Sequence, residues 1–205
     1  MTMRLWRGSP ALTIAGLAFA GLALVLLALL AFDTAQVLNE PRWLKPVKFA
    51  ASISIYLLTM AWFCADLERT ALVRIAAAVF ISSMSLEQIA ITFQAARETT
   101  SHFNAATPLD ASIYAAMGIS IIVNTIAAAG FLALYWKRTS PPRSAYAWGV
   151  RFGLILFILG SLEGYVMVAN NAHTVGAPDG GPGIPILRWS TEFGDLRIAH
   201  FIGIH

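Results

Sequence analysis

The apolar run from Ser9 to Phe32 constrains the fold of this chain more than any other feature. A helix needs about 20 mostly apolar residues to cross a bilayer core of about 30 Å, and this run is long enough. Ser9 is expected to cap the helix and Pro10 to occupy its first position. A cleaved signal peptide has a shorter apolar core of about 7–15 residues and a small-residue cleavage site, so we interpret the run as an uncleaved membrane helix.

The composition extends this interpretation to the whole chain. Of its 205 residues 58% are hydrophobic and 12% are charged, whereas soluble proteins average about 25% charged residues. The fourteen Lys and Arg residues lie scattered between apolar runs, so we attribute them to membrane topology and expect no nucleic-acid partner. Cys64 is the single cysteine, which excludes an internal disulfide and any site built from several thiolates.

The expected fold class is all-α: a polytopic transmembrane helical bundle in one domain, residues 1–205. Five full spans and an incomplete sixth are expected, at about 9–32, 47–65, 72–95, 109–136, 147–169 and, for the partial one, 195–205. Thr107 and Pro108 should start the fourth span, with Asp110 completing its cap. The last segment would reach about 16 Å, roughly half of the hydrocarbon core. Either the natural chain continues past His205, or this segment is a half-span held inside the protein.

The basic residues and the tryptophans indicate an orientation. With the N-terminus in the cytoplasm, eight of the fourteen Lys and Arg residues fall on the cytoplasmic side, as the positive-inside rule favours. All six tryptophans then lie near predicted interfaces. The glycine- and proline-rich stretch within 173–194 is expected to be an ordered lid or a flexible loop on the outer side.

Polar groups at one depth of the outer half predict a functional site. Ser83, Glu87 and Gln94 share a helical stripe, and carboxylates at membrane depth almost always face a protein interior or a wet cavity. Counting residues along each span puts Glu87 and Glu163 at the same level. Further candidates for lining a cavity there are Lys48, Tyr56, Gln94, Arg97, His102, Asn104, Tyr114, Asp195 and Arg197.

Histidine and carboxylate groups from several helices suit zinc or another divalent metal. The first candidate ligands are His200, His205 and Glu87, and a metal-dependent hydrolase would use Glu163 or Glu87 as the catalytic base. Haem is the second choice, since four histidines fall on the outer side. Small-molecule binding or proton-coupled transport, and a structural subunit without a cofactor, stay open as alternatives. Whether the protein is an enzyme is left undecided.

Two segments carry a resemblance to other proteins. The sequences QAARETTSHFN, from Gln94, and GAPDGGPGIPILRWSTEFGDLRIAHFIGIH, from Gly176, resemble segments of uncharacterised bacterial multi-pass membrane proteins. The resemblance implies a location in the bacterial inner membrane, with the lipid bilayer as partner. It assigns no activity, and it leaves a small-molecule ligand and an oligomer open.

Overall fold

The computed structural model describes residues 2–138 and 144–205, and within them the protein is all-helical apart from four two-residue strands. Five helices are long and apolar enough to cross a membrane, which supports a multi-pass protein in a lipid bilayer. Two short helices, α1 (Thr2–Gly8) and α7 (Arg197–Ile204), accompany them. The long helices are α2 (Pro10–Phe32), α3 (Leu44–Cys64), α4 (Ala71–Ala96), α5 (Pro108–Arg138) and α6 (Ala145–Asn170).

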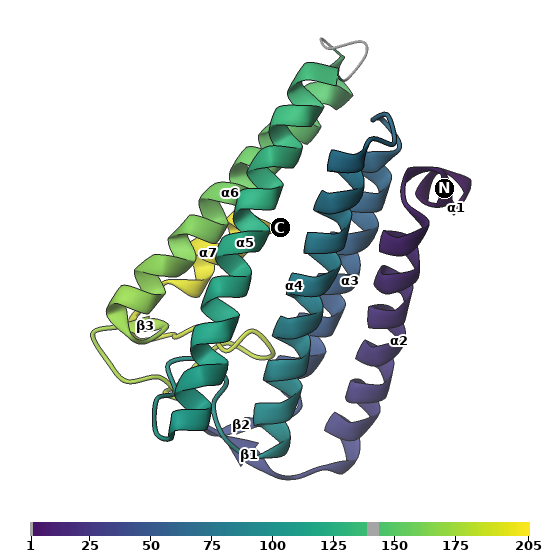
Figure 1. Ribbon diagram of the computed structural model, residues 1–205. Coiled ribbons are helices and arrows are strands. Elements are labelled where there is room, and N and C mark those ends of the chain that lie inside the picture. The colour runs from purple at the N-terminus through teal and green to yellow at the C-terminus, as the bar shows by residue number, and fades with distance from the viewer. Residues whose placement is uncertain (1, 139–143) are drawn as a thin grey trace.

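The long helices run alternately up and down, so their connectors gather at two ends of the bundle (Figure 1). One end holds the N-terminus and the turn between α3 and α4. The other end, which we call the loop face, holds the connectors 33–43, 97–107 and 171–196. The helix α7 runs from the loop face back toward the middle of the bundle, beside α6 (Figure 1).

Local sequence signals explain where most helices begin. Ser9 caps α2 by accepting a hydrogen bond from the Leu12 amide, with Pro10 at the first helical position, as predicted. The Thr107 hydroxyl accepts from the Asp110 amide and donates to the Asp110 carboxylate, at 3.1 and 2.6 Å, so the predicted cap of α5 is confirmed. The helix α3 begins at Leu44, earlier than expected, because a proline fits within the first turn of a helix.

Aromatic packing at mid-depth joins α3 to α4 and α6. The Tyr56 ring of α3 stacks on Phe157 of α6 with 5.0 Å between ring centroids, and meets the ring of Phe80 of α4 edge-on. The Tyr56 hydroxyl donates to Asn124 of α5 at 3.3 Å. Tyr56 of α3 thereby contacts three other helices, α4, α5 and α6.

Glycines let α7 lie directly on α6. A Cβ atom added to Gly203 would stand 2.6 Å from the Gly160 Cα, and one added to Gly160 would stand 2.7 Å from the Gly203 carbonyl carbon. Such distances are far below van der Waals contact, so both positions require glycine. The sequence predicted an incomplete sixth helix, and α7 is a short helix whose backbone touches a full span.

Short strands organise two of the loop-face connectors. Strands β1 (Gln36–Val37) and β2 (Glu40–Pro41) form a hairpin, and β3 (Thr174–Val175) pairs with β4 (Gly194–Asp195). Leu38 and Asn39 both have positive φ, 50° and 59°, which the tight two-residue turn of such a hairpin requires. These strands had not been predicted, because two-residue pairs carry no periodic signal.

Candidate functional site

The connector 171–196, which we call the lid, covers part of the loop face and is tied to the connector 33–43. Arg188 of the lid forms an ion pair with Glu40 at 3.5 Å, and the Asn39 side chain donates to the Gly180 carbonyl at 3.4 Å. The connector 97–107 joins the same assembly, because Arg42 pairs with both Asp33 and Glu98 at 2.5 and 3.0 Å. Segments far apart in sequence thus form one polar layer.

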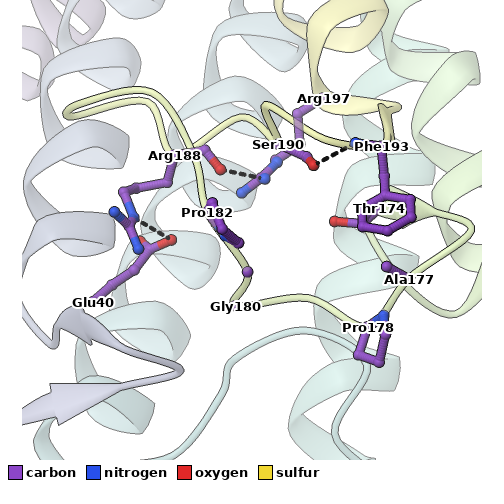
Figure 2. Close-up of a pocket in the computed structure, with 11 residues that line it drawn as sticks. Glu40, Thr174, Ala177, Pro178, Gly180, Pro182, Arg188, Ser190, Phe193 and Arg197 are labelled. Carbon is purple, nitrogen blue, oxygen red and sulfur yellow. Dashed lines mark hydrogen bonds and ion pairs between the residues drawn. The ribbon is translucent and has the colours of Figure 1, made fainter.

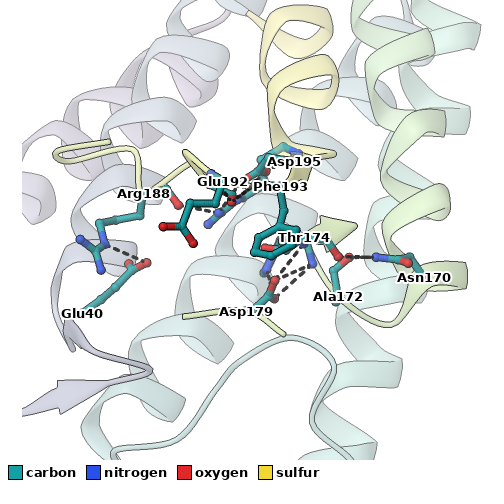
Figure 3. Close-up of polar contacts among 12 residues, drawn as sticks. Glu40, Asn170, Ala172, Thr174, Asp179, Arg188, Glu192, Phe193 and Asp195 are labelled. Carbon is teal, nitrogen blue, oxygen red and sulfur yellow. Dashed lines mark hydrogen bonds and ion pairs between the residues drawn. The ribbon is translucent and has the colours of Figure 1, made fainter. Parts of the chain in front are cut away.

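Asp179 holds the first half of the lid together (Figure 3). Its carboxylate accepts hydrogen bonds from the amides of His173 and Thr174 and lies 2.6 Å from the His173 Nδ1. Burial opposes ionisation of Asp179, but these donors outweigh it and the pKa of Asp179 is lowered. At His173, burial disfavours the protonated form and is the main cause of a lowered pKa, although the hydrogen bond with Asp179 acts in the opposite direction.

Asp195 orders the second half of the lid. It accepts from the Ser190 amide at 2.7 Å and forms an ion pair with Arg197 at 2.6 Å. A cavity of about 40 Å³ lies within the lid, and Glu40 and Arg197 complete its lining (Figure 2). It has room for about three water molecules, since one water needs about 10–15 Å³ of such space. The predicted cavity residues Asp195 and Arg197 therefore shape the lid.

Lys45 and His102 meet behind the lid. The Lys45 Nζ lies 3.2 Å from the His102 Nδ1, which the Ser101 hydroxyl also contacts at 3.0 Å. Burial, followed by the charges of Lys45 and of other histidines, keeps the pKa of His102 well below its ordinary value. A neutral His102 that accepts at Nδ1 carries its proton on Nε2, so the ring can donate to a ligand.

Aromatic rings surround this contact. His102 packs against Phe49 of α3, Phe103 and Tyr114 of α5, with ring centroids 6.1–6.3 Å apart. Phe103 in turn meets the His173 ring of the lid edge-on at 5.0 Å. The Tyr114 hydroxyl is buried and has no hydrogen-bond partner among the described residues. These rings wall the Lys45–His102 contact on the side of α5 and of the lid.

Glu87 belongs to α4, about two and a half turns before that helix ends at the loop face. Its side chain is only 2% exposed, and the Oε1 atom has no hydrogen-bond partner within the described residues. Its charge interacts with that of Lys45, although the two groups form no ion pair in this part of the chain. The expectation that Glu87 faces the bundle interior is confirmed by this burial.

His200 is anchored to α6. Its Nδ1 lies 2.7 Å from the Gly160 carbonyl oxygen and 3.8 Å from the Glu163 carboxylate, whose Oε2 atom is buried without a hydrogen bond among the described residues. The terminal His205 reaches α3 through a 2.8 Å contact with the Ser52 hydroxyl. The two histidines therefore point to different helices. Within the described residues no three His, Cys, Asp or Glu side chains converge as metal ligands would.

Other predicted site residues stabilise the fold near the loop face. Gln94 and Arg97 both donate to the buried Asp110 carboxylate, at 2.9 and 2.6 Å, and so lock α4 to the start of α5. Asn104 donates within its own connector, to Thr99 and to the Thr100 carbonyl. Tyr56 belongs to the mid-depth aromatic core.

The structure brings Lys45 into the site, which the sequence reasoning had missed. Its spacing of three from Lys48 was the available signal, because residues at that spacing share a helix face. Lys48 donates to the Ile186 carbonyl of the lid at 3.3 Å. Of the predicted residues, His102 contacts Lys45 and Tyr114 contacts the His102 ring, whereas His200 and His205 contact other helices.

A larger hollow of about 710 Å³ opens between α2 and α4. Its lining is mostly apolar, with Phe19, Leu22, Ile89 and Phe93 among its residues, and it offers no charged group. The group around Lys45 and His102, which carries charged and polar side chains, is therefore the better candidate for a functional site. No family model, no curated protein and no solved structure matches this chain.

Proposed function

We propose that this chain is a multi-pass protein of the bacterial inner membrane that binds a small polar molecule behind the lid. Lys45 and His102 would hold the ligand, and Glu87 would accept or release a proton beside it. The observation that carries the proposal is the 3.2 Å contact between Lys45 and His102. Glu87, whose buried Oε1 lacks a partner among the described residues, interacts electrostatically with Lys45.

Unsatisfied polar atoms support a binding role. A buried polar atom left without a hydrogen bond costs about 1–3 kcal/mol, and native proteins keep few of them without a reason such as a catalytic role or a bound molecule. In the described residues both the Glu87 Oε1 and the Tyr114 hydroxyl are of this kind. A ligand that both donates and accepts would satisfy them.

The expected orientation of the chain in the membrane favours entry of a ligand from outside the cytoplasm. With the N-terminus in the cytoplasm, the loop face and its lid lie on the extracytoplasmic side. By sequence, eight of the fourteen basic residues fall on the cytoplasmic side in this orientation, in keeping with the positive-inside rule. A ligand would then enter past the lid and not through the N-terminal end.

Thermal unfolding of the protein purified in dodecyl maltoside tests the proposal against a panel of amino acids, carboxylic acids, amines and polyols. A ligand that binds only the folded state raises the Tm with its concentration. We expect at least one compound to raise the Tm of the wild type, and the shift to be lost in Lys45→Gln and in His102→Gln. Lys137→Gln, at the far end of α5, is the matched control and should keep the shift.

Two results would overturn the binding site. One is a wild type that no compound in the panel stabilises. The other is a Tm shift of equal size in the wild type and in a Lys45→Gln/His102→Gln double variant. The proton role of Glu87 has its own readout, an infrared carboxyl band that changes on ligand addition in the wild type and is missing in Glu87→Gln.

A further inference from the structure

The cationic side chains of the loop face differ in how they are neutralised. Most of them are arginines with a carboxylate nearby, whereas the two lysines, Lys45 and Lys48, form no ion pair within the described residues. The neutralised pairs are Arg42 with Asp33, Arg97 with Asp110, Arg188 with Glu40, and Arg197 with Asp195.

The two lysines form a local excess of positive charge. They stand three residues apart at the start of α3, where like charges on one helix face repel each other and where the helix dipole also disfavours cations. Arg197 adds to the repulsion felt by both. Each ammonium group is bonded to a neutral acceptor, Lys45 to His102 and Lys48 to the Ile186 carbonyl.

The nearby acidic groups, Glu40 and Glu87, do not form ion pairs with the two lysines within the described residues. Glu40 and Glu87 interact with Lys45 at a distance, but Glu40 is already paired with Arg188. Glu87 is 2% exposed with a partnerless oxygen in the described part of the chain. In its protonated form, Glu87 would donate a hydrogen bond to an anion held by Lys45 instead of repelling it.

We infer that the ligand proposed to bind at Lys45 and His102 carries an oxyanion, a carboxylate or a phosphate group, and that Lys45 and Lys48 bind this group behind the lid. The inference rests on the proposed function and names its ligand class. Lysine ammonium groups bind carboxylates and phosphates as compact charges. Lys48 also reaches the lid, so a bound oxyanion would connect the lid to α3. The oxyanion can belong to a free molecule or to the headgroup of a lipid.

The experiment uses the full chain in dodecyl maltoside, a detergent without phosphate or carboxylate. The probes are sodium acetate, inorganic phosphate and mixed micelles with phosphatidylglycerol, each compared with sodium chloride at equal ionic strength. The variants are Lys45→Gln, Lys48→Gln and the double variant, with Lys45→Arg/Lys48→Arg to keep the charge and Lys137→Gln as the control. The readout is the Tm as a function of probe concentration.

We expect at least one oxyanion to raise the Tm of the wild type and of Lys137→Gln. Its apparent affinity should fall at least tenfold in the Lys→Gln double variant and be mostly kept in the Arg variant. Stabilisation by acetate or phosphate assigns a free ligand, and stabilisation by phosphatidylglycerol alone assigns a lipid headgroup.

Absence of any stabilisation beyond that of chloride, or an equal effect on the double variant, would overturn the inference. Its failure is distinguishable from failure of the proposed function. If neutral or cationic compounds of the panel stabilise the protein through Lys45 while oxyanions do not, the binding site stands and its ligand class is different.

Discussion

The Lys45 Nζ lies 3.2 Å from the His102 Nδ1 and joins the first turn of α3 to the connector between α4 and α5. The contact places an ammonium group beside an imidazole that burial keeps neutral. It also links residues 57 positions apart, so it depends on the folded bundle.

Replacing His102 should change how stability depends on pH. Its pKa is lowered in the folded protein, whereas an unfolded histidine titrates near pH 6.5. Below about pH 6.5 the unfolded chain therefore binds more protons, and stability falls as the pH falls. The Tm of the wild type in detergent should drop between pH 7.5 and 5.5 more steeply than that of His102→Gln. Parallel pH profiles would contradict the burial of a neutral His102.

Asp179→Asn should loosen the first half of the lid. The change weakens the hydrogen bonds from the His173 and Thr174 amides, so hydrogen exchange at these amides should become faster. The lowered pKa of Asp179 adds stability that is present above the unfolded pKa of about 4 and is lost as the pH falls below it. Glu192→Gln, an exposed change in the same lid, should leave exchange unchanged. Equal exchange in wild type and Asp179→Asn would show that the aspartate does not order the lid.

Gly203→Ala should destabilise the protein by about 1–3 kcal/mol, the usual cost of overpacking. Its Cβ would stand 2.6 Å from the Gly160 Cα, so α7 has to move away from α6. Gly153→Ala on α6 is the control, because nothing lies within 4 Å of an added Cβ there. Denaturant unfolding in detergent measures both variants. A Gly203→Ala protein as stable as the control would mean that α7 does not rest on Gly160.

Reporter fusions test the orientation. With the N-terminus in the cytoplasm, a reporter active only outside the cytoplasm should be inactive after Arg69, between α3 and α4, and active after Thr100, between α4 and α5. The reverse pattern would put the lid in the cytoplasm and move the proposed ligand source to that side.

The metal hypothesis from the sequence makes a separate prediction. It expects a stoichiometric divalent metal, or a haem absorption band, that is lost in His200→Ala and kept in His173→Ala. His200 is bonded through Nδ1 to Gly160, which leaves Nε2 to act as a ligand. Elemental analysis and a visible spectrum of the purified protein decide it. A wild type with neither metal nor haem would remove the cofactor and leave the small-molecule proposal.

Local sequence was enough to predict the five long helices and the caps of α2 and α5. Apolar runs of bilayer length define spans because an unpaired backbone cannot lie in hydrocarbon, and side chains such as Ser9 and Thr107 cap the residues that directly follow them. The burial of Glu87 could also be expected, since a carboxylate at membrane depth is costly when it faces lipid.

Which residues the predicted site residues contact was decided only by the tertiary structure. Counting depth along each helix gives a level but no direction around the bundle, so it could not tell that His200 contacts Gly160 of α6 while His102 contacts Lys45 of α3. Helix order and rotation are set by side-chain packing between spans, such as the Tyr56–Phe157 stack, and by the glycine contact that seats α7. These contacts join distant parts of the chain, and no local pattern in the sequence encodes them.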